Sequence, residues 1–180
     1  MSDIGHISIL HRVVEVSTVD AVKRHWSYAQ SVTEPITKFD SYSKGWDRLS
    51  DAIFPENSSI GHRFKKLTGL CTGVAWCQSV DDLLFEVDRP IRNDLERLER
   101  DAQTVFDRTK RYLQAHRSNQ KDDQELLESV GSLLWVIRSN SAHGRKTPSG
   151  AIGPTNRDEQ ICGLGAKVME DLYKFVFPSW

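Results

Sequence analysis

The chain has 180 residues, enough for one domain with a substantial buried core. Its 24 Lys and Arg residues are balanced by 25 Asp and Glu residues, which gives a net charge of −1 and a pI near 6.6. This balance excludes a general basic field that would attract nucleic acid to the whole surface, so any such contact has to be local.

The chain carries no recognisable membrane or secretion signal. No apolar run approaches the roughly 18 residues of a membrane span, and the first residues lack the apolar segment of a signal peptide. Cys71, Cys77 and Cys162 are odd in number and form no Cys-x-x-Cys pair. They are therefore interpreted as buried thiols, and a cytoplasmic location without membrane contact is expected.

The first 85 residues predict short elements that no motif connects. Residues 1–17 fit either a short strand or a poorly periodic helix. Short helices are expected from Ser17 to a point before Pro35, from Gly45 to Phe54, and from Ser59 to about residue 70. The function of this part of the chain stays unassigned.

A longer helix is predicted from Pro90 to about His116. Its apolar residues recur with alternating gaps of four and three, which is the spacing of a heptad seam. The other faces are rich in charged residues. Such a helix could form a dimer surface or could be one more core helix of the monomer. The seam consists of Ile91, Leu95, Leu98, Ala102, Val105, Thr109 and Tyr112.

Two further amphipathic helices are predicted, over residues 126–137 and 161–176, on either side of a Gly- and Pro-rich loop. Together with the earlier segments they predict an all-α helical bundle over residues 1–180. Trp26, Trp46, Trp76 and Trp135 fall at helical positions and are interpreted as core.

The candidate catalytic residues lie where the first of these two helices meets the loop. Arg138, Asn140 and His143 are separated by short, fixed gaps, and Gly144 follows directly. An imidazole can transfer protons near neutral pH, and a guanidinium can bind two phosphate oxygens. These groups are sufficient to cleave RNA without a metal, because RNA supplies its own nucleophile, the 2′-hydroxyl.

The stretch from Ile137 to Gly144 resembles the motif of the HEPN superfamily, in which an Arg, a polar residue and a His lie within a few residues. The resemblance covers about residues 124–177, and residues 86–180 are assigned to a HEPN-like bundle. It implies a homodimer in which two motifs share one cleft, and a metal-independent endoribonuclease, often with a toxin–antitoxin or antiphage partner. A toxin subgroup has a modified Tyr two residues after the His, but this chain has Arg145 there.

Spacing alone is a weak signal. Arg111 and His116 have the same separation but lie on the charged face of the long predicted helix, so they are interpreted as solvated. Each motif residue also has a simpler interpretation: Arg138 as a charge near helix carbonyls, Asn140 as a turn residue and His143 as a loop residue. The combination at one junction favours the catalytic interpretation.

Helix geometry adds a constraint. Residues five apart on one helix differ by about 140° in direction, so Arg138 and His143 converge only if the helix ends between them or if a second subunit contributes. A twofold dimer would bring both copies of the motif to the axis.

The sequence thus predicts an endoribonuclease that uses Arg138, Asn140 and His143, with an RNA-binding rim of Arg145, Lys146 and Arg157. No cofactor or metal is expected, because the remaining histidines lack metal-ligand spacing. The alternative is a non-catalytic dimerisation or RNA- or nucleotide-binding module that serves a separate effector.

Overall fold

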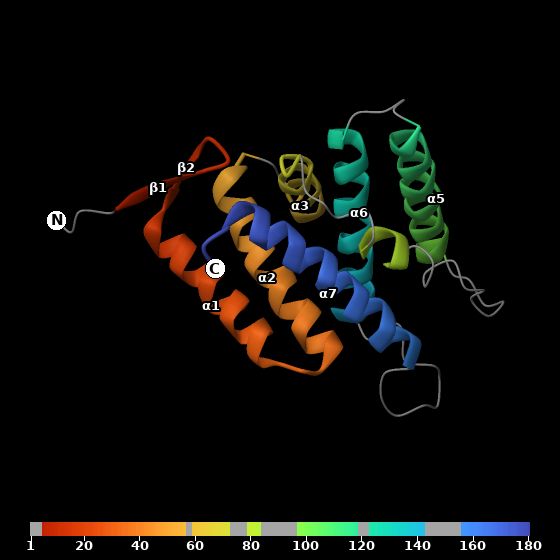
Figure 1. Cartoon of the computed structure of the whole chain (residues 1–180), viewed down its shortest axis with the longest axis horizontal. Coiled ribbons are helices and arrows are strands. Elements are labelled where there is room, and N and C mark those ends of the chain that lie inside the picture. The colour runs from red at the N-terminus through yellow and green to blue at the C-terminus, as the bar shows by residue number, and fades with distance from the viewer. Residues whose placement is uncertain (1–4, 57–58, 73–78, 84–96, 119–122, 143–155) are drawn as a thin grey trace.

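The computed structural model describes residues 5–56, 59–72, 79–83, 97–118, 123–142 and 156–180, with the backbone alone at 97–103, 123, 140–142 and 156–158. These residues are predominantly helical, which confirms the predicted all-α class (Figure 1). Residues 79–83 are also helical. The main elements are β1 (His6–Ile9), β2 (Arg12–Glu15), α1 (Val16–Ser31), α2 (Pro35–Ile53), α3 (Ile60–Gly69), α5 (Arg97–Arg117), α6 (Asp123–Ala142) and α7 (Asn156–Val176).

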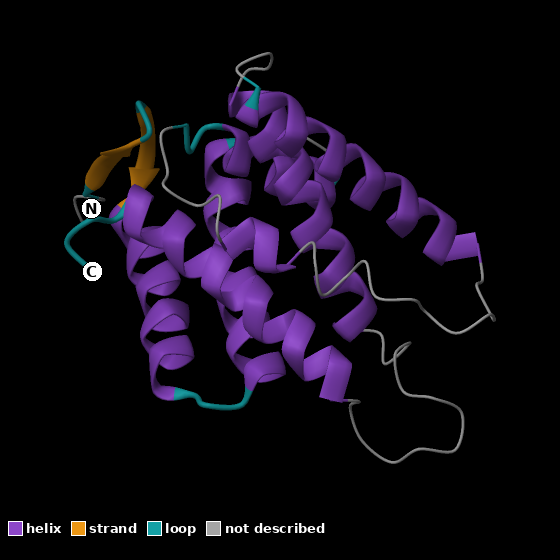
Figure 2. Cartoon of the chain, turned by 45° about the vertical axis from the view of Figure 1, so that its right-hand side comes forward, coloured by secondary structure: helices purple, strands orange, loops and turns teal. Residues whose placement is uncertain are grey.

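A small antiparallel hairpin precedes the bundle, so the strand interpretation of residues 1–17 is confirmed for β1 and β2. Ile7 is paired with Val14 and Ile9 with Arg12. Leu10 and His11 connect the strands with φ values of 49° and 61°, the sign needed for a tight hairpin turn. Ile9 and Val14 are buried, and the hairpin lies at the N-terminal end of α1 (Figure 2).

Helix α2 begins ten residues earlier than the sequence analysis predicted, at Pro35 rather than Gly45. Proline suits the first turn of a helix, since the amide hydrogen it lacks would have no helical acceptor there. The carboxylate of Glu34 caps this end by accepting hydrogen bonds from the backbone N–H groups of Ile36 (2.9 Å) and Thr37 (2.7 Å). Pro35 therefore starts one helix as well as limiting the one before it.

Helix α2 is central and joins the two halves of the chain in one core. It packs against α1 and α7 and also contacts α3 and α6 (Figure 1). Trp46 of α2 is fully buried, and its Nε1 donates a hydrogen bond to Thr68 Oγ1 of α3 at 3.2 Å. The hydroxyl of Tyr173 on α7 donates to the backbone carbonyl of Tyr42 at 2.9 Å. Residues that precede position 85 thus pack directly on the helix pair around the motif.

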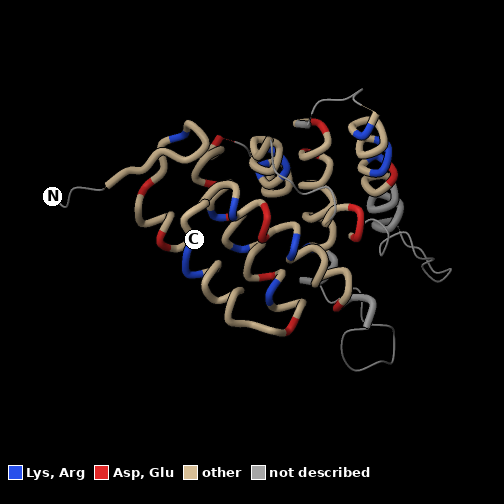
Figure 3. Tube along the Cα trace, in the orientation of Figure 1, with Lys and Arg blue, Asp and Glu red and all other residues tan. Residues whose placement is uncertain are grey.

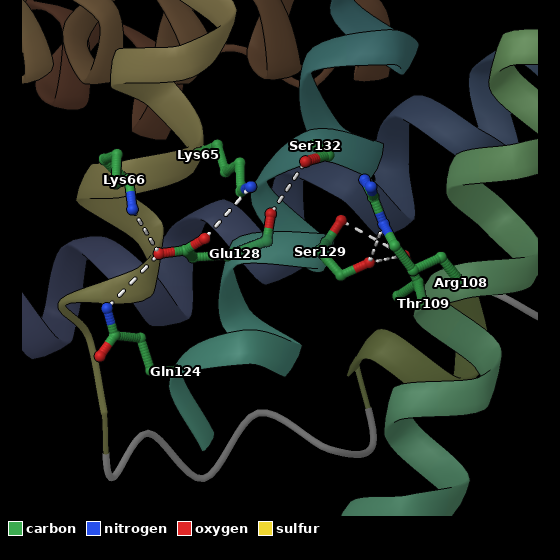
Figure 4. Close-up of polar contacts among 8 residues, drawn as sticks. All are labelled: Lys65, Lys66, Arg108, Thr109, Gln124, Glu128, Ser129 and Ser132. Carbon is green, nitrogen blue, oxygen red and sulfur yellow. Dashed lines mark hydrogen bonds and ion pairs between the residues drawn. The ribbon is translucent and has the colours of Figure 1, made fainter. Parts of the chain in front are cut away.

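Helix α5 packs on α6, and the face that it buries differs from the predicted heptad seam. Phe106, Thr109 and Leu113 are buried, whereas the predicted seam residues Val105 and Tyr112 are half-buried. Thr109 and Ser129 share a hydrogen bond of 2.8 Å between their hydroxyl oxygens (Figure 4). Thr109 belongs to the predicted seam, so the buried face overlaps that seam in part. Ile91 and Leu95 lie outside the described residues, as do the side chains of Leu98 and Ala102.

Glu128 of α6 forms ion pairs with two lysines of α3. Its carboxylate lies 3.2 Å from Lys65 Nζ and 3.1 Å from Lys66 Nζ, and Gln124 also donates to it (Figure 4). Nearby, Gly131 allows close helix contact, because a Cβ there would lie 2.8 Å from Thr68 Oγ1 and 3.0 Å from the Lys65 Cα. The second contact is with backbone, which cannot rotate away.

We expect Gly131→Ala to lower the free energy of unfolding by about 1–3 kcal/mol, because the clash separates α3 from α6. Gly163→Ala is the matched control. A Cβ at Gly163, within α7, would have only Pro35 Cβ as a neighbour, at an ordinary 3.6 Å, so this variant should gain about 0.5–1 kcal/mol from helix propensity. Urea denaturation of both variants checks the pair, and equal changes would contradict the packing argument.

Within the part of the chain described above, no helix has both the length and the apolar character needed to cross a membrane.

Candidate functional site

Arg138 lies on α6, four residues before the last described helical residue, Ala142. The described helix therefore extends over most of the interval between Arg138 and His143. His143 itself lies outside the described residues. The part of the proposed site that the structure describes is consequently the surroundings of Arg138.

An aspartate from a distant part of the sequence binds Arg138. Asp47 is on α2, and its Oδ2 lies 2.5 Å from Nη2 of Arg138. The two charged groups are therefore in direct contact as an ion pair. The pair joins the central helix of the bundle to the end of α6.

The indole ring of Trp135, which also belongs to α6, contacts the same guanidinium. Trp135 precedes Arg138 by three residues, so both side chains share one face of α6. The guanidinium carbon lies 4.8 Å from the centre of the Trp135 ring, within the range of a cation–π contact. The guanidinium of Arg138 therefore contacts a carboxylate of α2 and an aromatic ring of its own helix.

The position of Trp135 depends on a glycine of α3. A Cβ at Gly61 would lie 2.7 Å from Trp135 Nε1, so only glycine leaves room for the indole ring. Phe64 contacts the same ring, with 6.0 Å between the ring centres. Trp26 and Trp46 are buried, as predicted, whereas Trp135 is half-buried and supports Arg138; Trp76 lies outside the described residues.

A second arginine lies near the first ion pair. Arg63 of α3 makes an ion pair with Asp51 at 3.1 Å, and its charge also acts on Asp47. Asp47 and Asp51 are one turn apart on α2. Two carboxylates of α2 therefore meet one guanidinium from α3 and one from α6.

The surroundings of Asp47 disfavour the ionised form of its carboxyl group. Its side chain is 17% exposed, and that of Arg138 is 21% exposed. Burial raises the pKa of Asp47 to about 6, although Arg138 and Arg63 act to lower it. The desolvation penalty thus exceeds the attraction that the two arginines supply. Its second oxygen, Oδ1, is buried and makes no hydrogen bond with the described residues.

The other candidate residues are described only in part. Asn140 belongs to the last turn of α6 and Arg157 to the first turn of α7 by their backbones, and their side chains lie outside the described residues. Arg145 and Lys146 lie outside them altogether.

The second Arg–His pair of the chain lies elsewhere. Arg111 is exposed and His116 is half-buried on α5, in a helix that continues to Arg117. Lys and Arg residues and Asp and Glu residues are interspersed over the described helices in Figure 3. The described residues also hold no group of three or more His, Cys, Asp or Glu side chains arranged to bind a metal ion.

Sequence analysis did not identify Asp47, Arg63 or Trp135 as neighbours of the motif. Asp47 and Arg63 belong to helices far from Arg138 in the chain, and no spacing rule connects them. For Trp135 a signal existed, because an aromatic residue three positions before an arginine on a helix can contact it.

The chain matches no protein-family model, no curated protein and no solved structure. The resemblance to the HEPN superfamily therefore depends on the motif around Arg138.

Proposed function

We propose that the protein is a metal-independent endoribonuclease of the HEPN type that acts as a homodimer. The observation that carries the proposal is the guanidinium of Arg138, which Asp47 and Trp135 hold at the end of α6 while 21% of its side chain stays exposed. A partly exposed guanidinium that precedes a histidine by five residues in the sequence suits recognition of a phosphate whose charge changes during reaction.

The proposed reaction is an internal transfer at phosphorus. A base removes the proton of the 2′-hydroxyl, and the 2′-oxygen attacks the adjacent phosphorus. The bond to the 5′-oxygen breaks, and that oxygen receives a proton from an acid. The products are a 2′,3′-cyclic phosphate and a 5′-hydroxyl, so no water or metal is consumed in this step.

His143 is proposed to transfer protons, since an imidazole is present in both protonation states near neutral pH. Arg138 is proposed to bind the non-bridging oxygens, and Asn140 to orient the imidazole or donate to the phosphate. In a twofold dimer, the two copies of His143 could act as base and acid. Arg145, Lys146 and Arg157 are proposed to form a local basic rim for the RNA backbone.

The test is to incubate purified protein with total RNA and to identify the chemistry of the new ends. We expect 2′,3′-cyclic phosphates and 5′-hydroxyls, the same rate with and without EDTA, and no cleavage of DNA, which lacks the 2′-hydroxyl. Gel filtration of the same sample should give a dimer. Cleavage that EDTA abolishes, or 5′-phosphate ends, would show a different chemistry.

The alternative proposal is a non-catalytic dimerisation or RNA- or nucleotide-binding module. The ion pair between Arg138 and Asp47 favours it, because the guanidinium already has an internal anion. RNA that stays intact while it binds the protein would support this alternative. A role in toxin–antitoxin or antiphage defence, with a partner protein, and a cytoplasmic location are part of the proposal for either function.

A further inference from the structure

We propose that a basic patch on α1 and α2 binds the phosphate backbone of RNA. This inference rests on the proposed function for the identity of the ligand, and it adds a binding surface made of residues outside the motif. All members of the patch belong to the part of the chain that the structure describes. They are Lys23, Arg24 and His25 of α1 and Lys44 and Arg48 of α2.

Close packing of the two helices brings these side chains together. Helices α1 and α2 lie side by side (Figure 1), and the hydroxyl of Ser41 donates a hydrogen bond of 2.9 Å to the backbone carbonyl of His25. A Cβ at Gly45 would lie 3.0 Å from the Cβ of His25, so the helices approach closely at this point. Lys44 precedes Gly45 and Arg48 follows it by three residues. Both cations of α2 therefore lie near the imidazole of α1.

The charges around His25 are mainly positive. Burial lowers the pKa of His25, and the charges of Lys44, Arg48 and Arg24 lower it further. Asp40 acts in the opposite sense, but its carboxylate lies 2.6 Å from Lys44 Nζ and is thus partly neutralised. Such surroundings disfavour an additional cation and favour an anion.

The two arginines of the patch are available to an external anion. Arg24 and Arg48 are exposed, and neither makes an ion pair with any residue that the structure describes. Arg24 also borders an open hollow of about 450 Å³ on α1, together with Lys23, Ser27 and Asp20. A guanidinium without an internal carboxylate can donate two hydrogen bonds to one phosphate.

An exposed aromatic ring beside the patch favours RNA as the ligand. Tyr28 follows Arg24 by four residues, so both lie on one face of α1, and Tyr28 is 55% exposed. A nucleic acid offers phosphates to the arginines and a flat base to the ring. A membrane surface would instead require large apolar side chains among the cations. On α1 and α2 the other large apolar residue that is exposed is Val16, two turns before Arg24.

The test compares two double variants of the full-length protein. Arg24→Gln with Arg48→Gln removes two charges from the patch. Arg12→Gln with Arg111→Gln is the matched control, because these arginines of β2 and α5 are also exposed and also lack an ion pair with the described residues. Binding of an uncleavable, single-stranded 2′-deoxy oligonucleotide is measured by fluorescence anisotropy at several salt concentrations. Circular dichroism checks that both variants fold.

We expect the patch variant to bind the oligonucleotide on the order of tenfold more weakly in dilute salt, because it loses two phosphate contacts. The slope of log Kd against log salt concentration should fall by about 1.4, since each contact with a single-stranded phosphate contributes about 0.7. The control should change Kd by less than about threefold and should keep the slope, since it alters only the total charge.

Two further measurements locate the effect. In RNA cleavage, the patch variant should lower kcat/KM and leave kcat nearly unchanged, because the patch would bind the RNA equally before and during the reaction. In NMR spectra, the ring signals of His25 should shift when the oligonucleotide is added to the wild type. The ring signals of His116, on α5, should stay in place.

Equal losses of binding in the two double variants would overturn the inference, and so would unchanged binding in the patch variant. Vesicles of phosphatidylcholine and phosphatidylserine test the competing ligand. If the patch variant lost binding to these vesicles but still bound the oligonucleotide, the patch would belong to a membrane surface instead. A wild type that leaves RNA intact but binds the oligonucleotide through the patch would overturn the proposed nuclease and support this inference.

Discussion

His143→Ala is expected to reduce RNA cleavage on the order of a hundredfold or more while the protein stays folded. A positioned general acid or base typically contributes a factor of this size, and no other histidine lies within the motif. The rate of cleavage of a defined RNA under single-turnover conditions measures the effect. Binding of a 2′-deoxy oligonucleotide should persist, since Arg138 is unchanged.

The chain supplies its own control. His116 follows Arg111 at the same spacing as in the motif, but it is half-buried within α5, a helix that continues to Arg117. His116→Ala should cleave RNA at the wild-type rate. If it matched His143→Ala, the loss would come from destabilisation or from the wrong histidine, and the assignment of the motif would fail.

The sequence predicted the helices whose apolar residues repeat regularly. Leu126, Leu127, Val130, Leu133 and Leu134 are all buried in α6, and the spacing of these residues alone indicated that face. The first half of α2 was missed although Phe39 and Tyr42 continue the apolar spacing of Trp46, because this half begins at a proline, which can end one helix or start the next. Its cap, Glu34, is also not among the strongest N-cap residues.

The site was predicted only where its residues are neighbours in the chain. A local motif indicated Arg138, since its chemistry and its position at a helix end are both visible in the sequence. Asp47 was not predicted, because an acidic residue on an amphipathic helix is normally solvated, and its burial follows from how α2 packs against α6. Tertiary packing therefore decides which of the 25 acidic residues meets the guanidinium.

Arg138→Met is expected to lower the free energy of unfolding by about 3 kcal/mol at pH 8, because it leaves the Asp47 carboxylate without its closest cation. Methionine keeps much of the apolar stem that lies beside Trp135. At pH 5 the loss should be much smaller, since Asp47 is then largely protonated in the folded wild type. Urea denaturation at the two pH values measures both differences.

The sign follows from the direction of the pKa shift. The folded state raises the pKa of Asp47 from 3.8 to about 6, so it binds this proton more tightly than the unfolded chain does. The stability that protonation adds is fully present below pH 3.8 and is lost as pH rises through about 6. Removal of Arg138 takes away a charge that lowers this pKa, so the loss should extend to higher pH.

Asp47→Asn combined with Arg138→Met separates charge from packing. The double variant has neither buried ion, so it should be at least as stable as the wild type at pH 8, and this group should no longer contribute to the pH dependence. Its RNA cleavage should remain as low as that of Arg138→Met, since the guanidinium is still absent. A double variant as unstable as Arg138→Met would instead mean that Arg138 stabilises the fold by contact with Trp135, and that its pairing with Asp47 is incidental.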